Sequence, residues 1–217
     1  MSRKYGKLTT TSYAVLGLLA IRPWTTYELI QQLGRGVDRL WPRSRSKLFE
    51  EPKKLVAHGL AGASPSRIGK RPRTRYAITD DGRRALAEWL AAQSHQPLLE
   101  SEHLLKVFFA EQGAKENLQG TIAAMRDWAE EDAALHAGIA RSYLAGTGQF
   151  PERAAVVILT GRYLAELADM TRRWADWASD VVEGWPEDLR AAEPDWASFA
   201  AVASLADPPL PEAPPLS

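Results

Sequence analysis

The sequence predicts a mainly α-helical protein of two domains, the first of which also contains a short β-hairpin. Apolar residues recur at helical spacing along most of the 217 residues. Residues 73–79 instead alternate polar and apolar side chains like a half-buried strand, and residues 60–63 can supply an antiparallel partner. Charged residues are unevenly distributed along the chain. Residues 1–92 carry 18 Lys and Arg against 7 Asp and Glu, whereas residues 93–217 carry 9 Lys and Arg against 20 Asp and Glu. This asymmetry places the domain boundary near Ser94.

The composition bounds the class of protein. With 45% hydrophobic and 25% charged residues, the chain is an ordinary folded protein. The absence of cysteine excludes a disulfide, a thiolate nucleophile and a zinc-thiolate site, and it fits a reducing compartment, so we expect a cytoplasmic protein. Net charges of +11 and −11 indicate a first domain (residues 1–93) that binds a polyanion and a second domain (residues 94–206) with another task. Five prolines in residues 207–217 predict a disordered tail.

Two helices are predicted before residue 40. Residues 13–21 are nearly all apolar, and after a basic start this run could be mistaken for a signal peptide. It is short, however, and leads directly into another helical pattern, so we expect a buried helix, and no stretch reaches the roughly 18 to 20 apolar residues of a membrane span. Thr25 or Thr26 can cap the second helix, with Glu28 in its first turn and a glycine at its end, Gly34 or Gly36.

A basic helix is predicted from about Arg43 to His58. Its core-facing stripe consists of Leu48, Pro52 and Leu55, and the opposite side carries Ser44, Lys47, Glu51 and Lys54. Charged helix faces are usually only solvated, so this face alone indicates no ligand. A proline inside the helix removes one backbone hydrogen bond, which predicts a kink.

A cation-rich loop follows this helix. Residues 67–75 contain five cations and no acid, and Gly69 and Pro72 interrupt regular structure. Cations on a hairpin loop have no role in a core. Two short helices, the second basic and followed by a basic hairpin, form the outline of a winged helix-turn-helix with a small two-stranded wing. In that arrangement Arg, Lys and Ser contact bases or phosphates, and Glu51 can accept a hydrogen bond from cytosine N4.

The second domain is predicted to be all helical. A helix over residues 97–112 is stopped by Gly113, a long helix spans residues 115–145, and Pro151 begins a third. The stripe of the long helix is Leu118, Ile122, Met125, Ala129, Asp132, His136, Ile139 and Tyr143. The third helix carries a heptad seam, Val156, Thr160, Tyr163, Leu167, Met170, Trp174, Trp177 and Val181. So long a seam requires a partner, either the helix over residues 115–145 or a helix of a second copy.

Five of the eight tryptophans lie in this second half. A tryptophan cluster can stack on a flat aromatic ligand, but aromatic residues at helical spacing are more often packing residues. Asp132 and His136, polar residues on an apolar stripe, form either a pH-sensitive or ligand-contacting pair or, as we expect, a solvated edge of the seam. The candidates for an effector site are Trp128, His136, Trp174 and Trp177.

Enzymatic motifs are missing from the sequence. It contains no Gly-x-Ser-x-Gly elbow and no phosphate-binding loop, and the spacing of its four histidines does not suit a metal. We therefore expect neither an enzyme nor a bound cofactor or metal.

The order of three segments resembles the PadR family of bacterial transcriptional regulators over about residues 8–92. The segments are LTTTSYAVLGLLAIRPWTTYELI, SRSKLFEEPKKLVAHGLA and GKRPRTRYAITDDGRRAL. The residues that match the family pattern are Tyr27, Glu28, Leu48, Leu55, Gly59, Leu60, Tyr76, Thr79 and Gly82. Thr26 replaces the usual glycine, Phe49 the usual tyrosine and Pro52 the usual leucine, and Phe49 lacks the hydroxyl with which a tyrosine could contact a phosphate.

The residues and the resemblance together predict contacts and partners. The residues that we expect to contact double-stranded DNA are Tyr27, Arg43, Ser44, Arg45, Ser46, Lys47, Glu51, Lys54, Lys70, Arg71 and Arg73. The resemblance implies a homodimer formed by the helical domain, with Tyr163, Leu167, Met170, Trp174, Trp177 and Val181 at the interface. It also implies a hydrophobic or aromatic effector.

The hypothesis is a sequence-specific regulator, acting as a homodimeric repressor on a palindromic operator and released by a hydrophobic or aromatic small molecule. One alternative is a dimeric interaction protein whose basic face binds RNA or an acidic partner. Another is a regulator that senses no effector.

Overall fold

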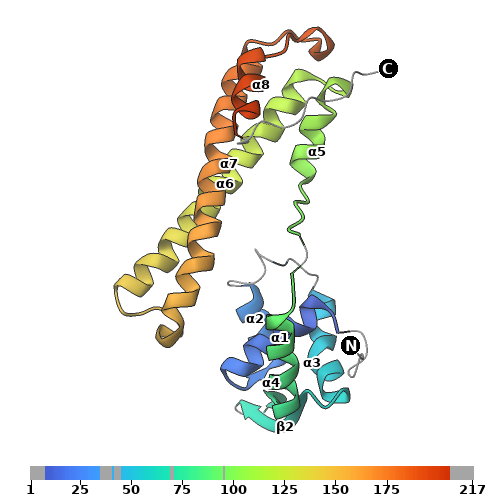
Figure 1. Ribbon diagram of the computed structural model, residues 1–217, viewed down its shortest axis with the longest axis vertical. Coiled ribbons are helices and arrows are strands. Elements are labelled where there is room, and N and C mark those ends of the chain that lie inside the picture. The colour runs from blue at the N-terminus through green and yellow to red at the C-terminus, as the bar shows by residue number, and fades with distance from the viewer. Residues whose placement is uncertain (1–7, 35–40, 42–44, 69–70, 95, 206–217) are drawn as a thin grey trace. The chain divides into compact units, whose positions relative to one another are not determined.

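The computed structural model describes residues 8–34, 41, 45–68, 71–94 and 96–205. The chain forms two compact units, Met1–Pro97 and Leu98–Ser217 (Figure 1). The division lies four residues beyond the boundary expected at residues 93 and 94. The predicted tail at residues 207–217 lies outside the described residues.

The helices of the first unit are α1 (Thr10–Ile21), α2 (Thr26–Gln32), α3 (Arg45–Ala57) and α4 (Asp80–Ala91). The predicted burial of the first helix is confirmed, because Val15, Leu16 and Leu19 on α1 are fully buried. Thr25 caps α2 and Glu28 closes its first turn, as the sequence predicted. Among the described residues, no helix has the length and apolar character needed to cross a membrane.

The sheet of the first unit has three antiparallel strands in the order β1-β3-β2: β1 (Trp24–Thr25), β2 (Ala61–Ile68) and β3 (Arg71–Ile78). The expected loop over residues 67–75 was too long, since both strands continue through most of it. Strand structure tolerates Pro65 because β2 is an edge strand. It tolerates Pro72 because β1 pairs with β3 only at Arg75 and Tyr76, so that Pro72 has a neighbouring strand on one side alone. The two-residue strand β1 was not predicted.

Helix α3 continues through Pro52. The predicted core stripe is confirmed, because Leu48, Pro52 and Leu55 are all buried. They belong to the core of the first unit, with Trp24 and Leu60.

The second unit contains the helices α5 (Glu102–Phe108), α6 (Lys115–Leu144), α7 (Ala154–Glu183) and α8 (Trp196–Ala203), with single 3-10 turns at Ala110–Gln112, Pro151–Arg153 and Leu189–Ala191. The helix predicted to begin at residue 97 begins at Glu102, because Ser101 caps it: the Ser101 Oγ accepts a hydrogen bond from the Leu104 amide at 3.2 Å. Helix α8 was not predicted.

Helices α6 and α7 lie side by side as an antiparallel hairpin (Figure 1). The Lys115 Nζ at the start of α6 donates to the carbonyl oxygen of Glu183 at 3.1 Å and to that of Trp185 at 2.5 Å. Further along, Arg126 Nε lies 3.1 Å from a carboxylate oxygen of Asp176. These contacts set the register of the hairpin.

The two helices bury different fractions of the predicted stripes. On α6 the predicted stripe is confirmed from Leu118 to His136. On α7 the seam that packs inward is displaced by one residue from the predicted one; we call it the inner seam, and it consists of Leu164, Ala168, Thr171, Ala175, Ala178 and Val182. The predicted heptad seam, which we call the outer seam, leaves Tyr163, Met170 and Trp177 exposed.

A buried polar pair lies within α6. Asp132 is 2% and His136 is 9% exposed, so the expectation of a solvated edge was wrong. The His136 Nδ1 lies 2.8 Å from the carbonyl oxygen of Asp132 and 3.3 Å from its Oδ2. Both contacts are made by Asp132, one turn earlier on the same helix. They hold the imidazole of His136 within the buried stripe of α6.

Candidate nucleic-acid interface

The structure brings together Tyr27 of α2 and Arg73 of β3, two of the residues expected to contact DNA. The Arg73 guanidinium carbon lies 5.6 Å from the centre of the Tyr27 ring, within the range of a cation-π contact. Tyr27 is 55% exposed, and its hydroxyl oxygen accepts a hydrogen bond from Gln31 Nε2 at 3.1 Å. This places the guanidinium of the half-buried Arg73 beside the hydroxyl of Tyr27 and the amide of Gln31, which are both exposed, a combination of donors that suits phosphate oxygens.

The start of α2 is fixed by reciprocal hydrogen bonds. The Glu28 Oε2 accepts from the Thr25 amide at 2.7 Å and from the Thr25 hydroxyl at 2.9 Å, while the Glu28 amide donates to Thr25 Oγ1. The Thr25 backbone N–H lowers the pKa of Glu28 most, and the Thr25 hydroxyl and the charges of Arg75 and Arg22 lower this pKa further. An ionised Glu28 therefore fixes the first turn of α2, which carries Tyr27.

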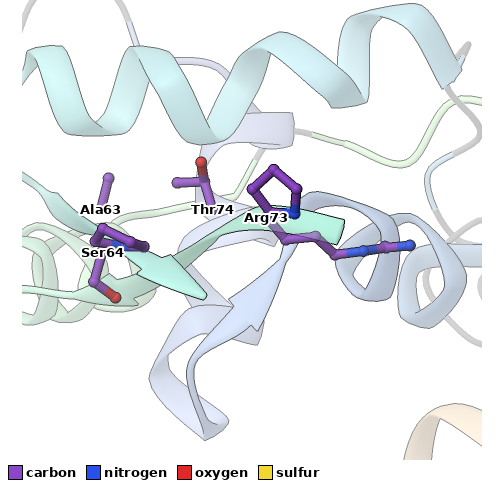
Figure 2. Close-up of a pocket in the computed structure, with 6 residues that line it drawn as sticks. Ala63, Ser64, Arg73 and Thr74 are labelled. Atoms are coloured by element: carbon purple, nitrogen blue, oxygen red, sulfur yellow. The ribbon is translucent and has the colours of Figure 1, made fainter. Parts of the chain in front are cut away.

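The wing presents cations and small side chains. Arg73 and Arg75 occupy alternate positions of β3 and so point to the same face of the sheet, where they lie opposite Ser66 and Ser64 of β2. An open hollow of about 410 Å³ on the hairpin is lined by Ala63, Ser64, Pro65, Pro72, Arg73 and Thr74. Figure 2 shows the Arg73 side chain extending away from Ala63 and Ser64. Because the lining side chains other than Arg73 are small, this part of the wing can approach a phosphate backbone closely.

The structure describes only some of the other residues that were expected to contact DNA. Arg45, Ser46 and Lys47 form the first turn of α3, and Arg71 begins β3. Arg43, Ser44 and Lys70 lie outside the described residues. Lys54 is exposed on α3, with its Nζ 2.9 Å from Glu51 Oε1.

The prediction for Glu51 was wrong. Its carboxylate faces α1 instead of the outside: Glu51 is 4% exposed, and its Oε2 accepts a hydrogen bond from the Ser12 hydroxyl at 2.8 Å. The reason lies in the helical repeat, because Glu51 follows Leu48 by three residues and precedes Leu55 by four, which puts all three on one face. The charge of the side chain led the sequence analysis to place it on the opposite face.

Two residues near the interface, Gln31 and Arg22, were not predicted. Gln31 stands one helical turn after Tyr27, so its spacing was a usable signal. Arg22 lies with its guanidinium carbon 3.9 Å from the centre of the Trp24 ring, a contact between residues two apart that helical spacing does not indicate.

The four candidate effector residues do not form one pocket. Trp128 and Trp177 are partly exposed, Trp174 packs against the core cluster around Ile122 and Ala175, and His136 is buried. His136 follows Trp128 by eight residues, about 12 Å along the helix axis. A hollow of about 920 Å³ between α5 and α6 is lined by none of the four. In the described part of the chain, no group of three His, Asp or Glu side chains is placed to hold a metal ion.

The first unit defines the class of protein. Two helices in sequence, the second followed by an antiparallel hairpin that carries the half-buried Arg73 and the exposed Arg75, make a winged helix-turn-helix DNA-binding protein. Residues 15–88 match the model of the transcriptional regulator PadR-like family, and residues 100–183 match the model described as virulence activator alpha C-term. The chain belongs to the PadR-like family of transcriptional regulators, in the long form with a helical C-terminal region.

Solved structures share this fold. Bacillus subtilis PadR in complex with operator DNA has a TM-score of 0.69 and 19% identity, covering 80% of this chain and 99% of that one. The same protein in complex with p-coumaric acid has a TM-score of 0.61 and 19% identity, covering 81% and 99%. The Vibrio cholerae virulence activator AphA has a TM-score of 0.58 and 21% identity, covering 78% and 96%. No curated protein sequence matches the chain.

Proposed function

We propose that this regulator binds double-stranded DNA in a sequence-specific manner and acts as a homodimeric repressor on a palindromic operator. The observation that carries the proposal is the cluster of the exposed Tyr27 and Gln31 with the half-buried Arg73, where α2 meets the wing of a winged helix-turn-helix unit. The relative from Bacillus subtilis, which shares the fold, has been solved with its operator. Two units related by a two-fold axis read two half-sites about one turn of DNA apart and so add their binding energies.

Fluorescence anisotropy tests whether the protein binds DNA in a sequence-specific manner. The protein is titrated against the duplex upstream of its own gene and against a scrambled duplex, over a salt series. We expect the upstream duplex to stay preferred as salt rises, because phosphate contacts weaken with salt while base contacts remain. Arg73→Ala should weaken binding to both duplexes and reduce the salt slope by about one.

Arg162→Ala is the control, because it removes the same charge from an exposed position of the second unit, where Arg162 pairs, among the described residues, with Glu166 on its own helix. It should leave binding unchanged. If the two wild-type affinities are equal and fall together with salt, the basic surface is an electrostatic patch only. That result would favour the alternative of RNA or an acidic protein as the partner.

The outer seam of α7 supports the homodimer. Tyr163 is 61%, Met170 47% and Trp177 46% exposed, although their heptad spacing is that of a helix interface. The flank of the hairpin beside the Arg126–Asp176 ion pair is ionic instead, with Arg172 Nη1 3.0 Å from Asp176 Oδ2. A hairpin with one ionic and one apolar flank gains free energy when a second copy covers the apolar flank.

Light scattering after gel filtration tests the dimer. Met170→Glu combined with Trp177→Glu should give a monomer with unchanged helix content, since both residues lie outside the inner seam. Arg162→Glu is the control, because it also changes charge on α7 but not on the outer seam, and it should stay dimeric. A monomeric wild type, or a dimeric double variant, contradicts the proposed interface. The monomer should also lose its preference for the upstream duplex.

Release by a hydrophobic or aromatic small molecule is part of the same proposal. It is supported by the complex of the Bacillus subtilis relative with p-coumaric acid and by the partial exposure of Trp128 and Trp177. With p-coumaric acid as the probe, we expect quenching of tryptophan fluorescence and dissociation of the bound duplex over the same concentration range. Quenching without dissociation, or neither effect up to millimolar probe, would instead support a regulator that does not respond to this class of molecule.

Repression itself is tested by transcription in vitro from the adjacent promoter. The purified protein should lower the amount of transcript, and the probe should restore it. An increase in transcript on adding the protein would identify an activator.

A further inference from the structure

The first turn of α1 contacts the centre of α3 and also Trp41, which precedes α3. At the centre of α3, the Ser12 hydroxyl donates to Glu51 Oε2 at 2.8 Å, and both residues are buried. In the segment before α3, Trp41 Nε1 donates to the hydroxyl oxygen of Thr11 at 3.1 Å. Thr11 and Ser12 are neighbours on α1, so two adjacent hydroxyls contact the centre of α3 and Trp41, four residues before α3.

The hydrogen bonds around Ser12 fix the direction of its hydroxyl. The Ser12 Oγ accepts from the Thr9 amide at 3.1 Å, as part of the reciprocal cap of α1, and its own proton goes to Glu51. The carboxylate thus lies beside the amino end of α1, where the helix dipole favours a negative charge. Lys54 contacts the other carboxylate oxygen at 2.9 Å, but its side chain is 61% exposed, so that ion pair contributes little.

Because of Pro52, α3 depends more on a contact with another helix. A proline has no N–H, so the carbonyl of Leu48 loses its partner in the hydrogen-bond ladder of α3. The internal restraint of the helix is therefore weakest one residue from Glu51. The bond to Ser12 supplies a restraint from another helix at that place.

We propose that Glu51 is a positioning residue for DNA recognition, which orients α3 through the Ser12 hydroxyl and touches no base. This inference rests on the proposed function, because the orientation of α3 matters only if α3 reads DNA. The sequence suggested instead that Glu51 contacts a base directly. A positioning role differs from a base contact because it makes Ser12, on a different helix, as important for DNA recognition as Glu51.

The restraint on α3 is measured first without DNA, by amide hydrogen exchange of α3 in the full-length protein. Ser12→Ala and Glu51→Leu should each raise exchange in α3 by about tenfold, the effect expected when one hydrogen bond to a charged group is lost. Glu51→Gln should raise it less, because the amide oxygen still accepts the Ser12 proton. Combining Ser12→Ala with Glu51→Leu should add no further increase, since the two changes remove the same bond.

The control is Glu50→Leu, the same substitution one position earlier, on an exposed side chain that forms an ion pair with Lys53. It should leave exchange in α3 unchanged. Thermal unfolding of each variant identifies any general loss of fold, and Glu51→Gln keeps the test valid if Glu51→Leu fails to fold. Unchanged exchange in both Ser12→Ala and Glu51→Gln would overturn the proposal.

The second measurement is the affinity for the upstream and scrambled duplexes. Ser12→Ala and Glu51→Leu should each weaken the upstream complex by about tenfold, leave the scrambled complex unchanged and leave the salt slope unchanged, because neither residue contacts a phosphate. Glu51→Gln should recover most of the preference. If Ser12→Ala has no effect while Glu51→Leu changes the preference at one base pair, Glu51 reads the base directly and the proposal is wrong.

Failure of the proposed function and failure of the positioning role give different results. A wild-type protein that prefers neither duplex overturns the proposed function, and the exchange data then still decide whether Ser12 and Glu51 restrain α3. Faster exchange in the variants with unchanged operator affinity overturns the positioning role alone.

Discussion

The two units of the chain differ in how completely they bury their apolar side chains. In the first unit, Trp24, Leu55 and Leu60 are fully buried, and only five large apolar side chains are exposed among the described residues. In the second unit eighteen are exposed. The first unit is therefore a closed core whose surface is free to carry cations, whereas the second exposes apolar surface that a partner can cover. The same contrast separates the two seams of α7.

The inner and outer seams of α7 show why the packed face of a helix is not always its most apolar one. Ala168, Thr171, Ala175 and Ala178 make up most of the inner seam. Small side chains let two helix backbones approach closely, so they suit a tight antiparallel hairpin. The larger residues, among them Met170 and Trp177, lie on the outer seam, where they remain exposed.

The largest effect is expected from a charge placed in the inner seam. Ala175 is fully buried against the cluster that contains Leu118 and Ile122, so Ala175→Glu buries a carboxylate without a partner. We expect a loss of about 4 kcal/mol or more in the free energy of unfolding of the second unit. Denaturant unfolding followed by circular dichroism measures it.

The control for that change is Ser179→Glu, which places the same charge on an exposed position of α7. It should alter stability by less than about 0.5 kcal/mol. If Ala175→Glu is tolerated equally well, the inner seam does not hold the hairpin together and the distinction between the two seams fails.

A glycine of the first unit should show the next largest effect. A Cβ at Gly82 would lie 2.1 Å from the carbonyl oxygen of Leu60 and 2.8 Å from Ile78 Cγ1. Gly82→Ala should therefore destabilise the first unit by about 2 to 3 kcal/mol, because backbone atoms cannot move aside cheaply. Amide exchange resolves the two units separately, and the second should be unaffected. Equal losses in both units would show that they unfold as one, which would weaken the comparison between them.

The control is Gly17→Ala in α1, where an added Cβ would meet nothing within 4 Å. Alanine has the higher helix propensity, so the variant should gain up to about 1 kcal/mol. A gain at Gly17 and a loss at Gly82 would separate close packing from backbone flexibility as the cause.

The sequence allowed accurate predictions wherever local spacing decides the structure. The cap at Thr25, the turn that Pro151 begins before α7, the buried α1 and the α6 stripe all follow from residues within a few positions of one another. The interface group was only partly predicted. Tyr27 and Arg73 were expected to contact DNA, but their proximity depends on the fold, because they lie on different elements.

The errors share a physical cause, which is that the partner of a side chain is not visible in its own segment. Glu51 was placed outside because it is charged, yet Ser12, 39 residues earlier, makes its burial favourable. Residues 67–75 were taken as a loop because of Gly69 and Pro72, and a strand accepts Pro72 where it has a neighbour on one side only. His136 is the exception: it was expected at a solvated edge, although its partner Asp132 lies four residues away on its own helix.

Lys115 links the start of α6 to the end of α7 in the second unit. Lys115 is 9% exposed, and its Nζ donates to the carbonyl oxygens of Glu183 and Trp185 at the carboxyl end of α7. Lys115→Met keeps the chain length and removes the donor, so we expect a loss of about 1 to 2 kcal/mol in the free energy of unfolding. The control is Lys106→Met, an exposed lysine paired with Glu102, which should cost less than about 0.5 kcal/mol. Equal effects would show that the carbonyl contacts of Lys115 add nothing.

The smallest effect concerns Glu28 and depends on pH. The Thr25 backbone N–H, with the Thr25 hydroxyl and the charges of Arg75 and Arg22, holds the pKa of Glu28 below its ordinary value of 4.5 in the folded protein. A lowered folded-state pKa means that the ionised carboxylate stabilises the fold above the ordinary value, and that this contribution is lost as the pH falls through the folded-state pKa. Glu28→Gln should therefore lower stability by about 1 kcal/mol at pH 7.

The difference between wild type and Glu28→Gln should shrink steadily below pH 4.5 in urea unfolding curves of the first unit. A difference that stays constant from neutral to acid pH would show that the shape of the side chain matters and its charge does not. Glutamine can still accept the Thr25 N–H, so the variant isolates the charge. The stability of the second unit should not change, because the contacts that lower this pKa all come from the first unit.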